Sequence, residues 1–240
     1  MQKQPGLRLG TADLHVHTNF SDGGDTPHAV YSSARRRGLD IIAITDHDTL
    51  VGALVAADAA RRAEAPPFVI VGEEVTSAQG HILALFLREL VRPHMSAADT
   101  IQAIHAQGGL AIAPHPFWRT LAAEGSTPHG VGALIFDLAF DAIEVRNGGF
   151  TPSMVRANRR AAAAAGALGA TRVGGSDAHV RQAIGWSHTR FPGRTPDDLR
   201  QAIAAGTTSV GGLLLNPAGV MRYAAWGLSR PAVGQLVKLG

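Results

Sequence analysis

The sequence predicts an α/β fold, a single-domain, imperfect (β/α) barrel of about seven strands that is similar to a TIM barrel. Short apolar runs alternate with alanine-rich helical stretches along the chain, which is typical of a mostly parallel sheet. Nearly every predicted strand ends in a polar cluster, as in barrels that carry functional residues at the carboxyl ends of many strands. No glycine-rich phosphate loop follows the first strand, so an open doubly wound sheet is not favoured.

Seven apolar runs bounded by turn residues are the predicted strands. They are residues 12–18, 40–45, 68–76, 81–87, 110–113, 142–145 and 171–174. A further late strand carries His188, for which the sequence indicates no role.

Helices with recognisable ends separate these strands. A Ser or Thr that can cap a helix, followed in three cases by proline at the first helical position, marks the starts, and glycine marks the stops. The starts are Thr26-Pro27, Ser96 with Asp99, Thr151-Pro152 and Thr195-Pro196; the stops are Gly38, Gly108-Gly109, Gly166 and Gly206.

No internal repeat or low-complexity linker divides the chain, so we expect one domain over residues 1–212. Residues 213–240 form an apolar extension that contains Trp226. We expect this extension to pack on the barrel; a dimer contact, and hence a homo-oligomer, or a membrane-surface helix are the alternatives.

The composition excludes several classes of function. The 240 residues are 45% apolar and contain no cysteine, which rules out disulfide scaffolds, thiol nucleophiles and cysteine-ligated metals. Eleven histidines leave nitrogen and oxygen ligands for any metal. The net charge of +3 and arginines on helix faces do not favour nucleic-acid binding. No secretory signal or membrane-spanning run is recognisable, so a cytoplasmic protein without a membrane partner is expected.

Two polar clusters at strand ends carry the first chemical signal. His15 and His17 are two residues apart on a predicted strand, so both side chains face the same way, and Asp22 follows in a turn. His47, flanked by two aspartates, directly follows a buried strand, where unpartnered polar groups would cost several kcal/mol. These groups need a metal, a hydrogen-bond network or water; the alternative is a solvated loop with a helix cap at Asp48 or Thr49.

Further metal-ligand residue types lie at the ends of the other strands, and His81 opens one of them. Glu73 and Glu74 are neighbours on a strand and face opposite ways, so one of them is expected at the site, and periodicity does not select which. His81, His115, Asp177 and His179 complete the set.

The ordered set of motifs is similar to that of the PHP family, the polymerase and histidinol phosphatase superfamily of metal-dependent phosphoesterases, over residues 12–210. The motifs are DLHVHT (13–18), SDG (21–23), ITDHDT (44–49), GEE (72–74), GHILAL (80–85), PHP (114–116) and GSDAH (175–179). AIEVRNG (142–148) and the short chain resemble the small stand-alone members.

This resemblance implies a distorted seven-stranded barrel that binds two or three divalent cations, Zn, Mn or Fe. One cation would take His15, His17, Glu74 and Asp177; a second would share Glu74 and add His81 and His115; a third would take Asp22, His47 and His179. Glu74 is chosen because the family's motif places its ligand third. The family often has His at the position of Asp22, which leaves the third site in question.

Other residues have supporting roles under the same resemblance. Asp13 and Asp46 would orient ligand histidines through their second ring nitrogen. Arg119 and Arg146 are candidates to bind phosphoryl oxygens, with an ordinary surface position as the alternative for each. Of the five histidines outside the motifs, His129 is the one that could reach the mouth of the site; the others are expected to be ordinary surface or packing residues.

The expected activity is hydrolysis of a small phosphorylated metabolite or nucleotide by a hydroxide that bridges two metals, with no protein nucleophile. The first alternative keeps the metals and cleaves a non-phosphate ester or a carbamate. The second is a 3'-5' exonuclease-like phosphodiesterase, and the third is a catalytically silent barrel retained for binding.

Overall fold

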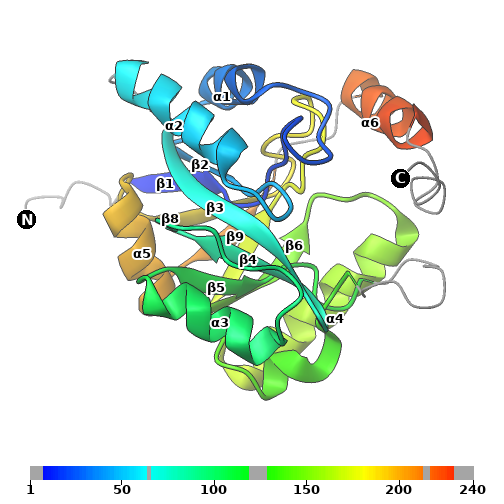
Figure 1. Ribbon diagram of the computed structural model, residues 1–240. Helices are drawn as coiled ribbons and strands as arrows, with labels where there is room; N and C mark the ends of the chain where they lie inside the picture. The colour runs from blue at the N-terminus through cyan, green and yellow to red at the C-terminus, as the bar shows by residue number, and fades with distance from the viewer. Residues whose placement is uncertain (1–7, 64–65, 119–128, 213–216, 230–240) are drawn as a thin grey trace, which may run out of the picture.

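The computed structural model describes residues 8–63, 66–118, 129–212 and 217–229 (Figure 1). The strands are β1 (Leu9–Asp13), β2 (Ile41–Ile44), β3 (Phe68–Ser77), β4 (Gly80–Leu85), β5 (Leu110–Ala113), β6 (Ala142–Asn147), β7 (Arg172–Gly175), β8 (His188–Pro192) and β9 (Ser209–Gly211). The helices are α1 (Pro27–Arg36), α2 (Val51–Ala63), α3 (Ala97–Ala106), α4 (Pro152–Leu168), α5 (Pro196–Ala204) and α6 (Pro217–Ser229), with a short 3-10 helix at Gly132–Phe136.

The strands form one sheet in the order β7-β6-β5-β4-β3-β2-β1-β8-β9. The first and last strands of this order approach each other, because β7 also contacts β8 and β9, and the sheet curls into a nearly closed barrel (Figure 1). The prediction of a barrel-shaped α/β fold is confirmed. We call the line where β7 meets β9 the seam of the barrel.

The regular alternation of strand and helix holds for only part of the sheet. All seven predicted strands are present, but β3 and β4 pair antiparallel, as do β4 with β5, β1 with β8 and β8 with β9. Only Ala78 and Gln79 lie between β3 and β4, and a two-residue connection can join only antiparallel strands. The first predicted strand, 12–18, is also too long, since β1 ends at Asp13 and the residues that follow bind loops instead.

The predicted helix starts are confirmed. Thr26, Ser96, Thr151 and Thr195 each accept a hydrogen bond from the backbone three residues on, and Thr195 forms a capping box with Asp198. The predicted stop at Gly166 is wrong: α4 continues to Leu168. Gly169 ends it with φ of 62°, a left-handed conformation that glycine adopts without steric cost.

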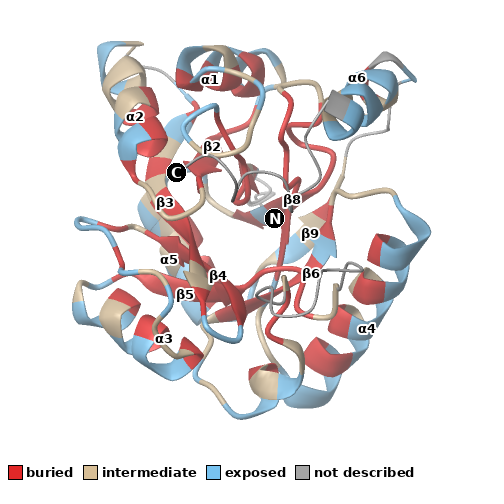
Figure 2. Cartoon of the chain, turned by 45° about the vertical axis from the view of Figure 1, so that its right-hand side comes forward, coloured by how far each residue is buried: buried red, intermediate tan, exposed pale blue. Residues whose placement is uncertain are grey.

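Helices pack their buried faces on the outside of the sheet, and the sheet itself is the most buried part of the molecule (Figure 2). All four residues of β2 and all four of β5 are buried. Two-sided burial explains why these strands are uninterrupted apolar runs in the sequence. None of the helices in the described part of the chain is long and apolar enough to cross a membrane.

Within the predicted extension, residues 217–229 form α6, and the rest of residues 213–240 lie outside the described residues. Two aromatic side chains of α6 contact the barrel. The ring of Tyr223 lies 5.7 Å from that of Phe150, and the ring of Trp226 lies 4.3 Å from that of His179. A dimer contact through this region stays a prediction.

Candidate metal centre

The polar strand ends meet at one place in the molecule. His15 and His17 follow β1 in an extended segment in which Val16 forms a bridge to Ala178. The backbone N–H of His17 donates to the carbonyl of Ala178 at 3.0 Å. This pairing brings the segment after β1 beside the segment after β7, which carries Asp177 and His179.

Glu74 lies at the middle of the cluster and is 1% exposed. Its Oε2 lies 3.0 Å from Nε2 of His15 and 3.1 Å from Nε2 of His17. Its other oxygen, Oε1, lies 2.9 Å from Nδ1 of His81 and 3.1 Å from Nε2 of His115. One carboxylate therefore separates two pairs of imidazoles, with one oxygen facing each pair.

Two aspartates extend the cluster on the side of His17. Asp177 Oδ1 lies 3.4 Å from Nε2 of His15 and 3.3 Å from Nε2 of His17. Asp22 Oδ2 lies 3.1 Å from Nε2 of His179 and 3.8 Å from Nε2 of His47. The nine candidate ligands thus fall into four overlapping groups whose ligand atoms lie within 4.8 Å of one another.

The hydrogen bonding of these histidines fits a cation better than a proton. Both ring nitrogens of His17 lie 3.1–3.4 Å from carboxylate oxygens. Among the described residues, however, neither nitrogen has a hydrogen-bond partner of acceptable geometry, and the same is true of Nδ1 of His115. Unpartnered buried nitrogens are costly. Imidazole and carboxylate together are the donor set that suits Zn, Mn and Fe(II), so the residues present fit divalent cations.

The carboxylates and imidazoles of the cluster shift the pKa values of one another, and each favours the charged form of the other. Burial alone would raise the pKa of Glu74, yet the imidazoles of His15, His47 and His81 hold it well below its usual range. Burial alone would lower the pKa of His17, yet Asp177 and Glu74 raise it to about 10. Protons and metal ions compete for these ring nitrogens, so metal binding here would release protons.

A glutamate outside the predicted set orients two of the candidate ligands. Oε1 of Glu144 lies 3.1 Å from Nδ1 of His15, and its Oε2 accepts the backbone N–H of His115 at 2.8 Å. Asn147 donates from Nδ2 to both Glu144 and Asp177 at 3.1 Å. The signal available in the sequence was the polar end of the strand over residues 142–145.

Asp13 and Asp46 hold backbone segments, and neither contacts an imidazole among the described residues. Asp13 accepts the N–H of Ser176 at 2.8 Å and of Gly185 at 2.7 Å. Asp46 accepts the N–H of Thr18 at 2.6 Å and its hydroxyl at 2.7 Å. Both carboxylates therefore position the loops that carry candidate ligands. The prediction was that they would contact the imidazole rings of ligand histidines directly.

Glu73 points away from the cluster, as expected for the neighbour of Glu74 on a strand. It is fully buried, and Oε2 accepts the N–H of Val91 at 3.0 Å. Oε1 has no hydrogen-bond partner in the described part of the chain. Burial raises the pKa of Glu73 to about 7 from its ordinary value of 4.5.

This raised pKa predicts that Glu73→Gln stabilises the protein at alkaline pH. Between pH 4.5 and 7 the folded state keeps a proton that the unfolded chain loses, so stability falls as pH rises through this window. Gln is neutral and can still accept from Val91. We expect Glu73→Gln to be more stable by about 1–3 kcal/mol at pH 8 and little changed at pH 4.5. Urea unfolding at both pH values measures the difference; an equal change at both would contradict it.

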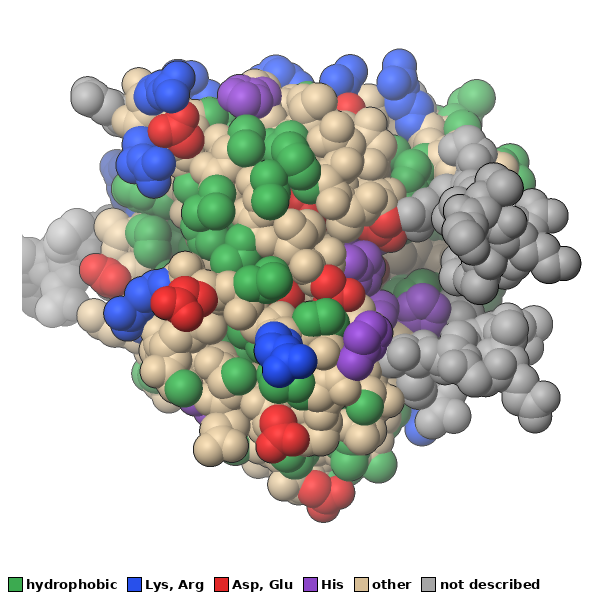
Figure 3. Space-filling model, in the orientation of Figure 1, with side chains coloured by type: hydrophobic (Ala, Val, Ile, Leu, Met, Phe, Trp, Pro, Cys, Tyr) green, Lys and Arg blue, Asp and Glu red, His purple; other side chains and the backbone are tan. Residues whose placement is uncertain are grey.

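A cavity of about 260 Å³ opens onto the cluster and is lined by seven of the nine candidate ligands. Its other walls include the aromatic rings of Trp118, Phe150, Tyr223 and Trp226. His129 also lines the cavity, with its ring 5.3 Å from that of His81, so it does reach the mouth of the site. Figure 3 shows histidine and acidic side chains gathered beside a hollow in one face of the molecule.

The two predicted phosphate-binding arginines are not in this cavity. Arg119 lies outside the described residues. Arg146 is exposed and lines a neighbouring cavity, because Glu144 and Asn147 occupy the inward positions of β6 around an irregularity in its pairing with β7. A role for either arginine in substrate binding stays a prediction.

Comparison with known proteins decides the family. A sequence model of the PHP domain matches residues 13–127, and a model of the PHP-associated region matches residues 155–208. The chain belongs to the PHP family. The resemblance predicted from the motifs is therefore confirmed.

The relatives of this PHP protein agree with that assignment. It is 35% identical over 147 residues to an uncharacterized protein of Methanocaldococcus jannaschii, a match that covers 57% of this chain and 81% of the relative. It is 37% identical over 102 residues to the phosphoribosyl 1,2-cyclic phosphate 1,2-diphosphodiesterase of Eggerthella lenta, covering 39% of this chain and only 38% of that enzyme.

The fold also has solved counterparts. A two-domain protein of Bacteroides vulgatus, described as containing a predicted PHP-like metal-dependent phosphoesterase, superposes with a TM-score of 0.70 at 22% identity. The superposition covers 91% of this chain and 69% of that one. The PHP protein is accordingly a metal-dependent hydrolase of the phosphoesterase family, and the identity of its substrate is a separate question.

Proposed function

We propose that this PHP protein hydrolyses a phosphoester of a small metabolite or nucleotide with the help of two or three divalent cations. One observation carries the proposal. The two oxygens of Glu74 face two separate sets of imidazoles, His15 with His17 and His81 with His115, at 2.9–3.1 Å. A buried carboxylate that serves two ligand sets is the arrangement expected of a shared ligand between two cations.

The division of the candidate ligands among the cations is taken from the family resemblance. His15, His17, Glu74 and Asp177 would hold one, Glu74, His81 and His115 a second, and Asp22, His47 and His179 a third. Bound Zn, Mn or Fe at such a centre supplies charge stabilisation for phosphoryl oxygens and lowers the pKa of water.

The chain itself contributes orientation and shape. Glu144 fixes the ring of His15 through Nδ1, which leaves Nε2 facing Glu74 and Asp177. Fixing the second nitrogen of a ligand histidine in this way selects its tautomer and raises its basicity. Asn147, which donates to Glu144 and Asp177, ties these two carboxylates to one another.

The cavity supports a small substrate. A volume of about 260 Å³ accommodates a phosphorylated sugar or part of a nucleotide more readily than a duplex. The rings of Trp118 and Trp226 would contact a sugar face or a base.

A hydrolysis screen with protein reloaded with Mn or Zn tests the proposal, with phosphate release measured for monoesters and the cleaved product measured by chromatography for the other substrates. Phosphomonoesters, cyclic and linear phosphodiesters, single-stranded DNA and aryl carbamates form the four arms. We expect turnover of a small phosphoester and inhibition by inorganic phosphate. Turnover of carbamates alone, or of DNA alone, would replace the proposal by one of the alternatives, and inactivity on all phosphoesters would reject it.

A further inference from the structure

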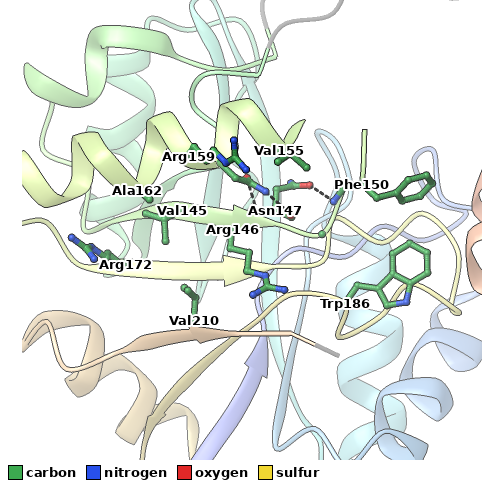
Figure 4. Close-up of a pocket in the computed structure, with 13 residues that line it drawn as sticks. Val145, Arg146, Asn147, Phe150, Val155, Arg159, Ala162, Arg172, Trp186 and Val210 are labelled. Atoms are coloured by element: carbon green, nitrogen blue, oxygen red, sulfur yellow. Dashed lines mark hydrogen bonds between the residues drawn. The ribbon is translucent and has the colours of Figure 1, made fainter. Parts of the chain in front are cut away.

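A second and larger cavity lies outside the barrel wall, at the seam. It has a volume of about 620 Å³, is open to solvent, and is lined by residues of β6, α4, β7 and β9 (Figure 4). This size is in the range of small-molecule sites in proteins. Apart from Asn147, the proposed hydrolysis uses none of the side chains that line this cavity.

Three arginines from three different elements line this cavity. Arg146 comes from β6, Arg159 from α4 and Arg172 from β7, and Figure 4 shows them spread along its length. No aspartate or glutamate is among its described lining residues. Within the described ranges none of the three guanidinium groups has a carboxylate within 4.0 Å, whereas Arg181 pairs with Asp25 and Arg194 with Asp40. The cavity therefore concentrates positive charge that the protein does not neutralise.

The backbone at the seam makes room for this charge. A Cβ atom on Gly212 would lie 2.5 Å from the carbonyl oxygen of Trp186 and 2.6 Å from Nη2 of Arg146, so the backbone after β9 passes close to this guanidinium. His188 is buried on β8, and its pKa is lowered by burial and by the positive charges of Arg190 and Arg146. His188 donates from Nδ1 to the carbonyl of Gly185 at 3.3 Å if it carries its proton there, which is compatible with a neutral ring.

The cavity adjoins the metal centre. Asn147, Gly149 and Phe150 line both cavities, so the turn after β6 forms a shared wall. The side chain of Asn147 contacts Glu144 and Asp177, whereas Arg146, the residue before it, faces the other way. The arginines are thus positioned to bind an anion beside the metal centre and not on it.

We propose that this cavity is a second anion-binding site, for a small ligand that carries at least two phosphate groups. Each guanidinium group can donate two parallel N–H hydrogen bonds to the oxygens of one phosphate. Three guanidinium groups spread along a cavity therefore match a diphosphate group better than a single carboxylate. The ligand is a free diphosphate or the diphosphate of a nucleotide. The site goes beyond the proposed hydrolysis and does not depend on it.

Calorimetric titration of the full-length, metal-loaded protein with inorganic pyrophosphate tests this site. The variant Arg146→Gln/Arg172→Gln and the single variant Arg159→Gln remove guanidinium groups from it. Arg156→Gln is the matched control, an exposed arginine of the same helix α4 that does not line the cavity. All four changes are at exposed positions, and thermal unfolding verifies that each variant is folded.

We expect two binding events in the parent protein, one of them weakened about tenfold or more in the double variant and weakened in Arg159→Gln. Metal content and the other event should not change, and Arg156→Gln should bind like the parent. A titration with ADP and AMP separates a nucleotide from a free diphosphate. Unchanged pyrophosphate binding in the double variant would overturn the proposal, as would an equal loss in Arg156→Gln, which would indicate a general effect of net charge.

Discussion

Glu74→Gln is expected to lower phosphoester hydrolysis by at least about a thousandfold and to reduce the metal content of the purified protein. Glu74 faces four imidazoles with its two oxygens, and Gln replaces one of those oxygens by an NH₂ group that cannot bind a cation. One pair of histidines then faces a donor instead of an acceptor. Both of the cations that Glu74 is proposed to share would therefore be affected by a change of a single atom.

Metal analysis and steady-state kinetics on the same preparation measure this effect. Glu73→Gln provides the control, because Glu73 is the adjacent residue, is equally buried and lies on the opposite face of β3. The control should retain its metals and its activity. A Glu74→Gln protein with full metal content and activity within threefold of the parent would show that Glu74 is not a shared ligand.

Removing the metals with a chelator is expected to abolish activity and to destabilise the fold. A ligand present at about a thousand times its Kd adds about 4 kcal/mol to the free energy of unfolding, and that contribution disappears with the metal. What then holds the centre together is the attraction between carboxylates such as Glu74 and histidines such as His17. The chelated protein should therefore unfold at a lower temperature and become sensitive to pH.

The pKa values give the direction of that sensitivity. The pKa of His17 is raised from 6.5 to about 10, so its contribution to stability is complete below pH 6.5 and is lost as pH rises towards 10. The pKa of Glu74 is lowered, so its contribution is present above pH 4.5 and falls in acid. Thermal unfolding of chelated protein at pH 6 and pH 9 should show the lower stability at pH 9, and Mn or Zn should restore both stability and activity. An unfolding temperature insensitive to chelation would argue against a metal centre.

Much of the barrel could be predicted because its strands are buried on both faces. Runs such as residues 41–44 and 110–113 are apolar throughout, short and bounded by polar or turn residues, and these features together indicate buried strands. The three residues of β9 are too few to show a pattern, and two of them are exposed or half-buried. The antiparallel pairing of β3 and β4 follows from the two-residue turn between them. The prediction of a regular barrel did not take the shortness of this connection into account.

The candidate site shows the same division. Residue type and position at strand ends were enough to bring together His15, Glu74 and Asp177, since carboxyl ends of parallel strands converge. Glu144 lies beside His15 and His115 in the same cluster, but no role was assigned to it from the sequence. In a sequence, a carboxylate that orients a histidine cannot be distinguished from one that binds a metal. The direction of Arg146 followed from a local shift in strand pairing that no periodicity reveals.

The bridge between Val16 and Ala178 has a consequence for how the protein is made. It joins the segment after the first strand of the barrel to the segment after the seventh, so His15 and Asp177 are 162 residues apart in the order of synthesis. A ribosome must translate three quarters of the chain before the two meet. Until then the set of His15, His17, Glu74 and Asp177 is incomplete, so a cation held by these four residues would bind only after this region has been translated.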